Sequence, residues 1–353
     1  MAKPPVLVLF NKPVLAPNHP EAASEYDIFD TVADTVKILS AAGFDVRQLG
    51  IDYDPRPLLD ELRSRRPLAI FNLFEGLATQ TATEVSAVAL LEWLNIPFTG
   101  CPSTALILGR DKIRTKHLLR AAGLPTPSYL VIDQLPAPTW DGGWPAIVKP
   151  ALQDASIGID QGSVVTTLEQ LAARVEFVLS RYGTPVLVER FLDGREFHVH
   201  AIEDGLQRAV NVLPPAEIAY QKGKPDWWPV YTFTAKWDEA SQEYKDAPLV
   251  APVMLPPEPT ARLNEIVSRA FRLLSCRDYA RLDLRMDSSG EFCILEVNPN
   301  PYLNSLALVK GLEAIGRTHE QFVVDITLNA ITRGGGEVTP GTIRVPVGVV
   351  TPG

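Results

Sequence analysis

The first hundred residues alternate between two hydrophobic periodicities. Apolar residues run together in short stretches, and between these stretches they recur every three or four residues, which predicts buried strands joined by amphipathic helices. The strands are expected at residues 6–10, 44–50, 68–74 and 96–100, and the helices from about Ile28 to Ala42, Pro57 to Ser64 and Thr83 to Leu94. Because such alternation is typical of a doubly wound parallel sheet, we predict an N-terminal α/β domain over residues 1–110.

Beyond residue 110 the pattern changes to α+β. Residues 111–193 combine a basic helix with two apolar strands and a further helix from about Leu168 to Leu179, which predicts a small central unit. Residues 194–333 are richer in strands, and residues 334–353 resemble a tail with at most one short strand. Within 194–333 we expect a Pro- and Trp-rich loop at 214–257, a helix from about Thr260 to Leu274, a hairpin, and a helix from about Thr318 to Ile331.

Composition narrows the class of protein. The chain has 353 residues, 46% hydrophobic and 21% charged, and its 33 basic and 42 acidic side chains give a net charge of −9, which disfavours a nucleic-acid partner. No apolar run reaches the roughly 18 residues of a membrane helix, and no cleavage-site pattern follows the first apolar run, so we expect a cytoplasmic protein without a membrane partner. Cys101, Cys276 and Cys293 lack metal-ligand spacing and are expected to be free thiols.

The hairpin YARLDLRMDSSGEFCILEVNPNP, residues 279–301, carries the most informative polar residues. Two alternating runs flank Asp-Ser-Ser-Gly, and a turn centred on Ser288 and Ser289 would place Arg281 opposite Glu296. One face then carries Arg281, Asp283, Glu296 and Asn298, and the other carries Ala280, Leu282, Leu284, Leu295 and Val297. Taken alone, the stretch also fits a cross-strand salt bridge on a half-exposed sheet. The Pro-Asn-Pro that follows Asn298 favours instead a cluster of hard oxygen ligands for Mg²⁺.

A site for phosphate would have to be built without the common glycine-rich motifs, because the sequence contains neither a dinucleotide fingerprint nor a P-loop. Lys149 ends an apolar strand, where a buried ammonium group needs an anion, although a lysine extending along the surface is the alternative. Glu189 and Arg190 end another apolar strand, where Glu189 could accept a hydrogen bond from an adenine amino group. The small residues at 154–158 would let backbone N–H groups approach phosphate oxygens.

Two histidines, His198 and His200, fall on one face of a predicted strand. A zinc site would need a third ligand, and the sequence offers none nearby. We therefore interpret both as strand residues near a sheet edge or a ribose pocket.

Taken in order, these stretches resemble the ATP-grasp superfamily and, within it, the D-alanine–D-alanine ligase family. The resemblance covers roughly residues 96–310 and rests on IPFTG, LGRDKIRTKHLLRAAGLPTP, PAIVKPALQDASIGI, VLVERFLDGREFHV, FTAKW and the hairpin. It implies an N-terminal doubly wound parallel sheet followed by a two-lobed ATP-grasp domain, with ATP and Mg²⁺ (or Mn²⁺) as cofactors. The central subdomain at 111–193 would bind adenine and phosphate, and the C-terminal subdomain at 194–333 would hold the metal.

The resemblance also implies a role for each matching residue. The implied ATP-binding residues are Lys112 and Lys149 for the phosphates, Glu189, Arg190, Leu192 and Leu295 for adenine, and Glu196 for ribose. The implied catalytic residues are Arg281 at the transferring phosphoryl group, Lys236 from a mobile loop and Ser156 from the loop over the phosphates. The implied metal ligands are Asp283, Glu296 and Asn298.

The reaction implied by the resemblance is ligation of a carboxylate to an amine through an acyl phosphate. Its substrates would be amino acids or short peptides, and relatives in the family suggest a homodimer. The labile acyl phosphate would need a lid, for which the Trp-rich segment around Lys236 is a candidate, with ordinary packing as the alternative for its tryptophans. The other class of function left open is a Mg-ATP-binding protein without ligase activity.

The departures from the family pattern gather where amino-acid substrates would bind. The family's Ser-x-x-x-Glu-Val-Ser becomes SEYDIFDTV, where Glu25 or Asp27 could substitute for the glutamate. Its His-Gly-x-x-Gly-Glu-Asp becomes residues 72–78, without the histidine, and its Gly-Met-Thr-x-x-Ser becomes residues 302–307, in which Ser305 could keep part of the role. A pocket that loses hydrogen-bonding groups should accept a different substrate.

Overall fold

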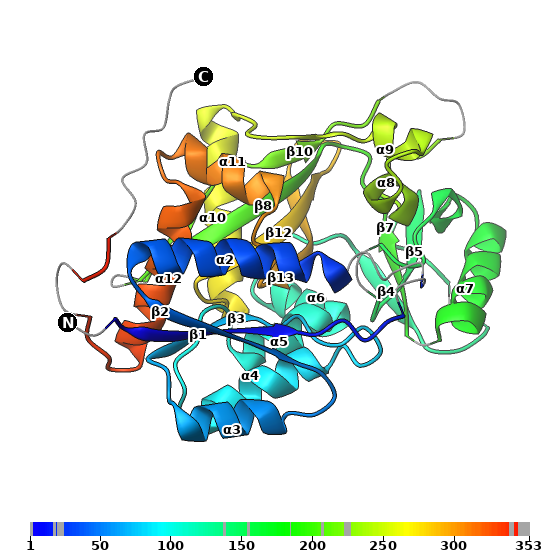
Figure 1. The fold of residues 1–353 in the computed structure, drawn as a ribbon. Coiled ribbons are helices and arrows are strands. Elements are labelled where there is room, and N and C mark those ends of the chain that lie inside the picture. The colour runs from blue at the N-terminus through cyan, green and yellow to red at the C-terminus, as the bar shows by residue number, and fades with distance from the viewer. Residues whose placement is uncertain are drawn as a thin grey trace.

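A computed structural model describes residues 3–16, 19, 25–136, 139–153, 156–183, 185–205, 208–221, 227–338 and 342–344. Within these residues the strands form three sheets, one parallel and two antiparallel, with helices packed against them (Figure 1). The predicted combination of an N-terminal parallel α/β sheet with α+β units after it is confirmed. None of the helices in the described ranges has the length and apolar character needed to cross a bilayer.

The N-terminal sheet is covered by helices on both faces. Its parallel strands have the order β2-β1-β3, with β1 at Pro5–Asn11, β2 at Asp45–Ile51 and β3 at Ala69–Leu73. Alternate residues of β1 point to opposite layers: the even-numbered ones pack with α2 (Ile28–Ala42) and α12 (His319–Arg333), and the odd-numbered Leu7 and Leu9 pack with α3 (Arg56–Ser64) and α4 (Thr83–Trp93). The carboxyl ends of these strands are therefore left to face the rest of the molecule.

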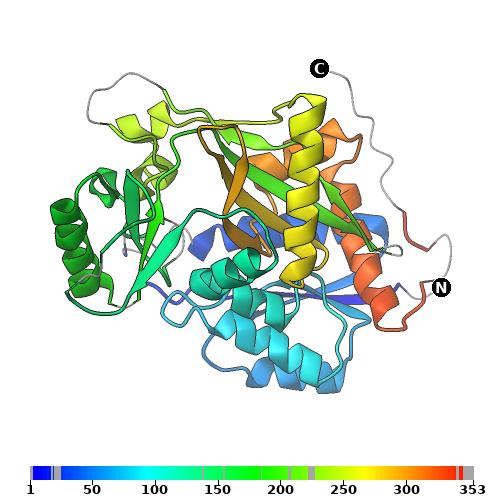
Figure 2. The ribbon, with the colours of Figure 1, turned by 180° about the vertical axis from the view of Figure 1, so that it is seen from behind.

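The central sheet has the order β4-β7-β5-β6, and all of its pairings are antiparallel. Its strands are β4 (Tyr129–Ile132), β5 (Ala146–Pro150), β6 (Val164–Val165) and β7 (Val186–Arg190), with the short 3₁₀ helix Gln161–Ser163 before β6. Helix α7 (Leu168–Tyr182) buries Leu171, Val175 and Val178 against one face (Figure 2). Helices α5 (Ser103–Arg110) and α6 (Lys112–Ala121) connect this unit to the N-terminal sheet. On the face opposite α7, Ile147 packs near Phe191 and Val230, and Ile147 and Lys149 line a cavity.

The C-terminal sheet has the order β11-β10-β8-β12-β13, and β9 also pairs with β8. Its strands are β8 (Glu196–Asp204), β9 (Ala209–Val212), β10 (Ala216–Ile218), β11 (Leu249–Val250), β12 (Tyr279–Met286) and β13 (Phe292–Pro299). Helix α10 (Pro257–Leu273) crosses one face, as Figure 2 shows, and packs on the odd-numbered residues of β8. Helix α11 (Leu306–Ala314) follows the hairpin. The even-numbered residues of β8 face the other way: Glu196 and His198 line the cavity beside the central sheet, and Ile202 packs in the core of the N-terminal sheet.

Two expectations about this region are wrong. The segment predicted as one long loop contains β10, β11 and two short helices, α8 (Phe233–Trp237) and α9 (Gln242–Asp246), because Thr232 and Ser241 cap these helices with side-chain hydrogen bonds. The sheet-edge position considered for the two histidines is wrong, since β8 is paired on both sides, but the pocket position stays open because His198 lines a cavity. Helices α5 and α11 and strands β4 and β9 were not predicted. Of the tail, only residues 334–338 and 342–344 are described.

The hairpin forms, but its register differs from the prediction. The turn has three residues, with Gly290 at a φ of 88°, so Met286 pairs with Phe292 rather than with Glu291. The register then shifts once more between Asp283 and Leu284, so that Arg281 pairs with Asn298 and not with Glu296. This bulge also moves Leu295, which was predicted to lie on the core face, to the pocket side.

Candidate active site

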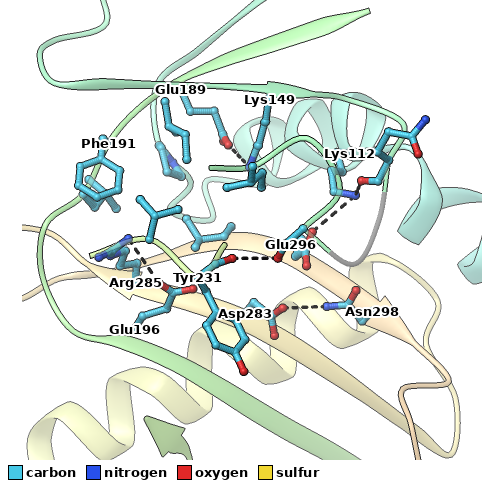
Figure 3. A pocket seen from close by; sticks show the side chains of 18 of the residues that line it. Lys112, Lys149, Glu189, Phe191, Glu196, Tyr231, Asp283, Arg285, Glu296 and Asn298 are labelled. Carbon is cyan, nitrogen blue, oxygen red and sulfur yellow. Dashed lines mark hydrogen bonds and ion pairs between the residues drawn. The ribbon is translucent and has the colours of Figure 1, made fainter. Parts of the chain in front are cut away.

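A cavity of about 190 Å³ lies between the central and C-terminal sheets (Figure 3). The ends of β5 and β7 form one wall, and the facing surface of β8, β12 and β13 forms the other. The structure brings every residue predicted for ATP binding, catalysis or metal binding to this one cavity. They are Lys112, Lys149, Ser156, Glu189, Arg190, Leu192, Glu196, Lys236, Arg281, Asp283, Leu295, Glu296 and Asn298.

The wall formed by β8, β12 and β13, which we call the floor of the cavity, is polar, and the register of these strands explains why. Directly paired residues of neighbouring strands share a face, so each row across β8, β12 and β13 places three side chains side by side. One row is His198, Asp283 and Glu296. The next row is His200, Arg281 and Asn298. The floor is therefore a small grid of acidic, basic, amide and imidazole groups fixed by backbone hydrogen bonds.

Asp283 is at the centre of the grid and makes several contacts. The Arg281 guanidinium donates to both of its carboxylate oxygens, at 2.7 and 2.9 Å, and Asn298 Nδ2 donates to Oδ2 at 3.2 Å. His198 Nε2 lies 3.9 Å from Oδ1. Burial would lower the pKa of Arg281, but Asp283 outweighs it and raises that pKa, while burial and Arg281 lower the pKa of His198 well below its usual value. Arg281 therefore stays cationic and the imidazole neutral.

The floor residues fit a hard divalent cation. Asp283 and Glu296 offer carboxylate oxygens from opposite strands, and Asn298 offers an amide oxygen two residues along. No cluster of three or more His, Cys, Asp and Glu side chains suited to a metal occurs in the described ranges. This agrees with Mg²⁺ chemistry, in which few protein carboxylates act together with water and phosphate oxygens, and it does not suit a protein-only zinc cage.

Cations face this floor from the other wall. Lys112, at the start of α6, is 6% exposed, and its Nζ donates to the Gln153 carbonyl at 2.8 Å and lies 3.6 Å from Glu296 Oε2. Ser156, in the small-residue loop, has a φ of +64° and donates from Oγ to the Tyr231 carbonyl at 2.9 Å. Positions 154 and 155 of that loop lie outside the described residues.

A buried charge cluster supports the rear of the cavity. The Glu189 carboxylate forms ion pairs with Lys149 and with Lys116, and both Glu189 and Lys116 are 1% exposed. Burial would raise the pKa of Glu189, but the two lysines outweigh it and lower the pKa. Burial lowers the pKa of Lys116, against the attraction of Glu189. With two ammonium groups on one carboxylate, the cluster has a net positive charge beside the cavity.

The part of the lining around Leu192 and Leu295 is apolar with a polar end. Leu192 and Leu295 line it together with Ile147 and Phe191. At the polar end, Glu196 accepts a hydrogen bond from the Tyr220 hydroxyl at 2.7 Å and lies 3.3 Å from Arg285 Nη1. Arg285 itself stacks over the Phe191 ring at 4.7 Å. Burial raises the pKa of Glu196, and Arg285 and Tyr220 oppose that rise.

The segment over the cavity is partly helical. Lys236 lies in the short helix α8, at the cavity lining, with its Nζ 5.3 Å from the centre of the Trp237 ring. Tyr231 contacts the loop of Ser156 through its carbonyl oxygen. The Trp-rich segment at 225–237, which was predicted to be a lid, thus touches the loop of Ser156, although residues 225 and 226 lie outside the described residues.

Sequence reasoning missed several residues of this site. They are Tyr231 and Arg285 in the cavity lining, and Lys116 and Tyr220, which contact the lining residues Glu189 and Glu196. Lys116 lies four residues after Lys112, which places both on one side of α6, so helical spacing could have indicated it. Arg285 lies two residues after Asp283 on the same strand face. Nothing in the local pattern points to Tyr220, which arrives from a separate loop.

On the side of the N-terminal sheet, the structure separates the two acidic residues considered for the substrate. Glu25 is 8% exposed, and its carboxylate accepts from the backbone N–H groups of Val14, Leu15 and Ala78. Asp27 is exposed at the N-terminus of α2. Ser305 Oγ lies 3.4 Å from His200 Nε2 and caps α11. The Glu25 carboxylate is thus already hydrogen-bonded to backbone N–H groups, whereas Asp27 is accessible to a ligand.

Comparisons with known proteins agree with this arrangement. A family model described as the D-ala D-ala ligase C-terminus matches residues 118–327. A D-alanine–D-alanine ligase of Haemophilus influenzae is 31% identical over 72% of this chain and 81% of its own length. One of Alcanivorax borkumensis is 33% identical over 70% and 73%. An uncharacterized protein, y4sG, of Sinorhizobium fredii is 34% identical over 67% of this chain and 66% of its own.

Solved structures show the same fold. The D-alanine–D-alanine ligase of Bacillus anthracis complexed with ATP superposes with a TM-score of 0.71 at 18% identity, over 94% of this chain and 98% of that one. The ligase of Coxiella burnetii gives a TM-score of 0.66 at 20% identity, over 94% and 95%. The shared architecture therefore extends across the N-terminal sheet as well as the region that the family model matches.

Proposed function

The chain belongs to the D-alanine–D-alanine ligase family of ATP-grasp ligases, and we propose that it activates the carboxylate of an amino acid or short peptide with ATP. The activated carboxylate is then joined to an amine, with release of ADP and phosphate. The observation that best supports this reaction is the grid of Arg281, Asp283, Glu296 and Asn298 facing Lys112 and Lys149 across one cavity.

The proposal divides the work among the regions expected from the sequence. Residues 111–193 bind adenine and phosphate, residues 194–333 hold the metal, and residues 1–110 contribute to the amino-acid site. In this assignment Glu189, Arg190, Leu192 and Leu295 contact adenine, and Glu196 binds the ribose. The apolar wall with one carboxylate at its end suits a flat base attached to a sugar.

Mg²⁺ would be held by Asp283, Glu296 and Asn298, and when bound it would offset negative charge on the phosphates. Lys112 and Lys149 bind the phosphate oxygens, and Arg281 stabilises the charge on the phosphoryl group in transfer. A substrate carboxylate oxygen attacks the terminal phosphorus of ATP, and the bond to ADP breaks. The amine then attacks the acyl carbon, the phosphate leaves, and the amine loses a proton.

Water must be kept from the acyl phosphate, and the segment around Lys236 is suited to that task. Tyr231 already contacts the Ser156 loop through a backbone oxygen. We propose that this segment closes over the bound nucleotide and brings Lys236 to the terminal phosphate, with Ser156 below it. In this position Lys236 would add a third cation around the transferring group.

The test is ADP release with purified protein, Mg-ATP and pairs of D- and L-amino acids. The proposal expects release that depends on both a carboxylate and an amine, and a peptide product by mass spectrometry. If Mg-ATP binds and no pair stimulates ADP release, the protein is a nucleotide-binding protein without ligase activity.

A further inference from the structure

The acidic residue Glu75 occupies a distinctive place at the edge of the N-terminal sheet. It follows β3, at the carboxyl end of the parallel strands, which is where open α/β sheets bind ligands. Its backbone N–H donates to Asn11 Oδ1 at 3.2 Å. The next residue, Gly76, has a φ of +93°, and a Cβ there would lie 2.6 Å from the Thr81 carbonyl oxygen. The turn that presents Glu75 is therefore tightly fixed.

Glu75 borders a small cavity that adjoins the active-site floor. The cavity is lined by Thr31, Asn72, Glu75, Tyr279 and Asn300, together with neighbouring apolar residues, and its volume is about 10 Å³. Tyr279 and Asn300 lie two residues beyond Arg281 and Asn298 on the hairpin strands, which is about 7 Å further along. The cavity is thus the continuation of the catalytic floor toward the N-terminal sheet, with room for roughly one water-sized group.

The charge at this edge is negative and unbalanced. Among the described residues, no lysine, arginine or histidine forms an ion pair with Glu75 or with Asp27. Burial of the carboxyl group raises the pKa of Glu75 to about 7, and repulsion from Asp27 adds to the rise. The residue as a whole is nevertheless exposed, so that a ligand can reach it from solvent. Because Glu25 is held by three backbone N–H groups, the open carboxylates here are those of Asp27 and Glu75.

The small cavity also contains polar atoms without partners. Asn72 is 3% exposed and Thr31 is 2% exposed, and Asn72 Nδ2 and Thr31 Oγ1 have no hydrogen-bond partner among the described residues. The Asn72 Oδ1 atom accepts from the Phe74 N–H at 3.3 Å, which leaves Nδ2 for the cavity. Buried polar atoms of this kind are normally satisfied by water or by a polar ligand group. A methyl side chain, such as that of alanine, would satisfy none of them.

We propose, on the basis of the ligase function above, that Glu75 and Asp27 select a substrate amino acid carrying a second cationic group. A basic or diamino amino acid would place its α-ammonium and its side-chain ammonium against these two carboxylates. Water in the small cavity would link the substrate to Asn72 and Thr31. A single α-ammonium leaves one carboxylate unpaired, so amino acids with neutral side chains are poorer substrates.

The experiment compares amino acids matched in length, ornithine against norvaline and lysine against norleucine, each as D- and L-forms. Binding is measured by calorimetry on the full chain with Mg²⁺ and a non-hydrolysable ATP analogue, and ADP release is measured in parallel with ATP. The variants are Glu75→Gln and Asp27→Asn, with Asp30→Asn on the exposed side of α2 as the control. All three remove one negative charge, and their thermal midpoints report folding.

Wild-type protein should bind the cationic member of a pair at least about tenfold more tightly, and Glu75→Gln should reduce that ratio about tenfold. Asp27→Asn should also reduce this affinity ratio, and Asp30→Asn should leave the ratio unchanged. Equal binding of ornithine and norvaline by the wild type, or an unchanged ratio in Glu75→Gln, would overturn the inference. Selective binding without any ADP release would support the inference and contradict the ligase function, so the two failures are distinguishable.

Discussion

The nucleotide cavity and the small cavity beside the N-terminal sheet, which we call the two ends of the cleft, differ in how their acidic side chains are paired. At the nucleotide end each acidic side chain already contacts a cation: Glu189 contacts Lys116 and Lys149, Glu196 contacts Arg285, and Asp283 contacts Arg281. At the N-terminal edge, Asp27 and Glu75 have no such partner among the described residues. Paired charges are oriented before a ligand arrives, whereas unpaired ones are stabilised by the ligand itself.

The two ends also differ in how closely their residues match the family pattern. Every residue matched to the family's ATP and metal positions lies in the nucleotide cavity, and the altered motifs lie at the other edge. An end whose acidic side chains are already paired with cations suits a co-substrate that is the same in every turnover, and an open, acidic end suits a specific amino acid. The predictions below test the two ends in order of expected effect.

The largest effect is expected for Glu296→Gln. If Glu296 holds Mg²⁺, losing its charge should slow ADP release about 10²–10³-fold at low Mg²⁺, since the metal contributes several kcal/mol of charge stabilisation. Excess Mg²⁺ should recover part of the rate. The control is Glu291→Gln, at the turn end of the same hairpin, whose side chain is 59% exposed. Equal rates for both variants across a Mg²⁺ titration would remove Glu296 from the metal site.

Lys116→Met should produce the next largest effect. It leaves Glu189, 1% exposed, with Lys149 as its remaining cation, and breaking a buried pair of this kind costs about 3 kcal/mol of unfolding free energy. The measurement is urea unfolding, with ATP affinity by calorimetry alongside it. Arg114→Met, two residues earlier on the exposed side of α6, is the matched control. A loss no larger than that of the control would mean that the cluster is not a stabilising unit.

The affinity for a cationic substrate at the acidic end should depend on pH. In the free protein the pKa of Glu75 is raised to about 7, and a cationic substrate binds its ionised form. The groups facing it are Asp27 and Tyr279, and burial keeps the pKa of Tyr279 well above its usual value, so that the phenol stays neutral. The affinity for ornithine should therefore rise up to about tenfold per pH unit as the pH approaches 7, and level off above it.

The control for this profile is the same titration with norvaline and with Glu75→Gln. Without the carboxylate, or without the second cation, the slope below pH 7 should be smaller. Parallel profiles for ornithine in wild type and variant would assign the titration to another group, and would count against Glu75 as the selecting residue.

Some features of the fold and of the site could be predicted from local sequence patterns alone. Helix α2 was predicted from about Ile28 to Ala42, and the structure has these bounds, with Gly43 at a φ of 110° directly after it. A long amphipathic repeat followed by glycine depends only on local interactions. The shared face of Arg281, Asp283, Glu296 and Asn298 was also found, since any register that keeps the alternation on each strand can retain it.

Register and burial were harder to predict, because both depend on distant contacts. The longer turn and the bulge beside Leu295 are invisible in an alternating pattern, yet together they decide that Asp283 rather than Arg281 pairs with Glu296. Lys116 lies in a helix that is basic on most sides, and its burial depends on contacts with Glu189 and Thr126, which are distant in sequence or outside the helix. The unpaired state of Glu75 likewise depends on which cations the fold brings near it.

The smallest effect is expected for Tyr220→Phe. The Tyr220 hydroxyl donates to Glu196 at 2.7 Å, and without it the carboxylate keeps only Arg285 as a neighbour while its pKa is already raised by burial. If Glu196 binds ribose, ATP affinity should fall by a factor that corresponds to about 1 kcal/mol. Tyr244→Phe, at an exposed tyrosine, is the control.

The affinity for a free amino acid should not change in either variant, because the unpaired acidic end lies beyond the opposite side of the floor. A loss of ornithine binding in Tyr220→Phe would mean that the two ends of the cleft are coupled, and that the contrast between them is a matter of degree.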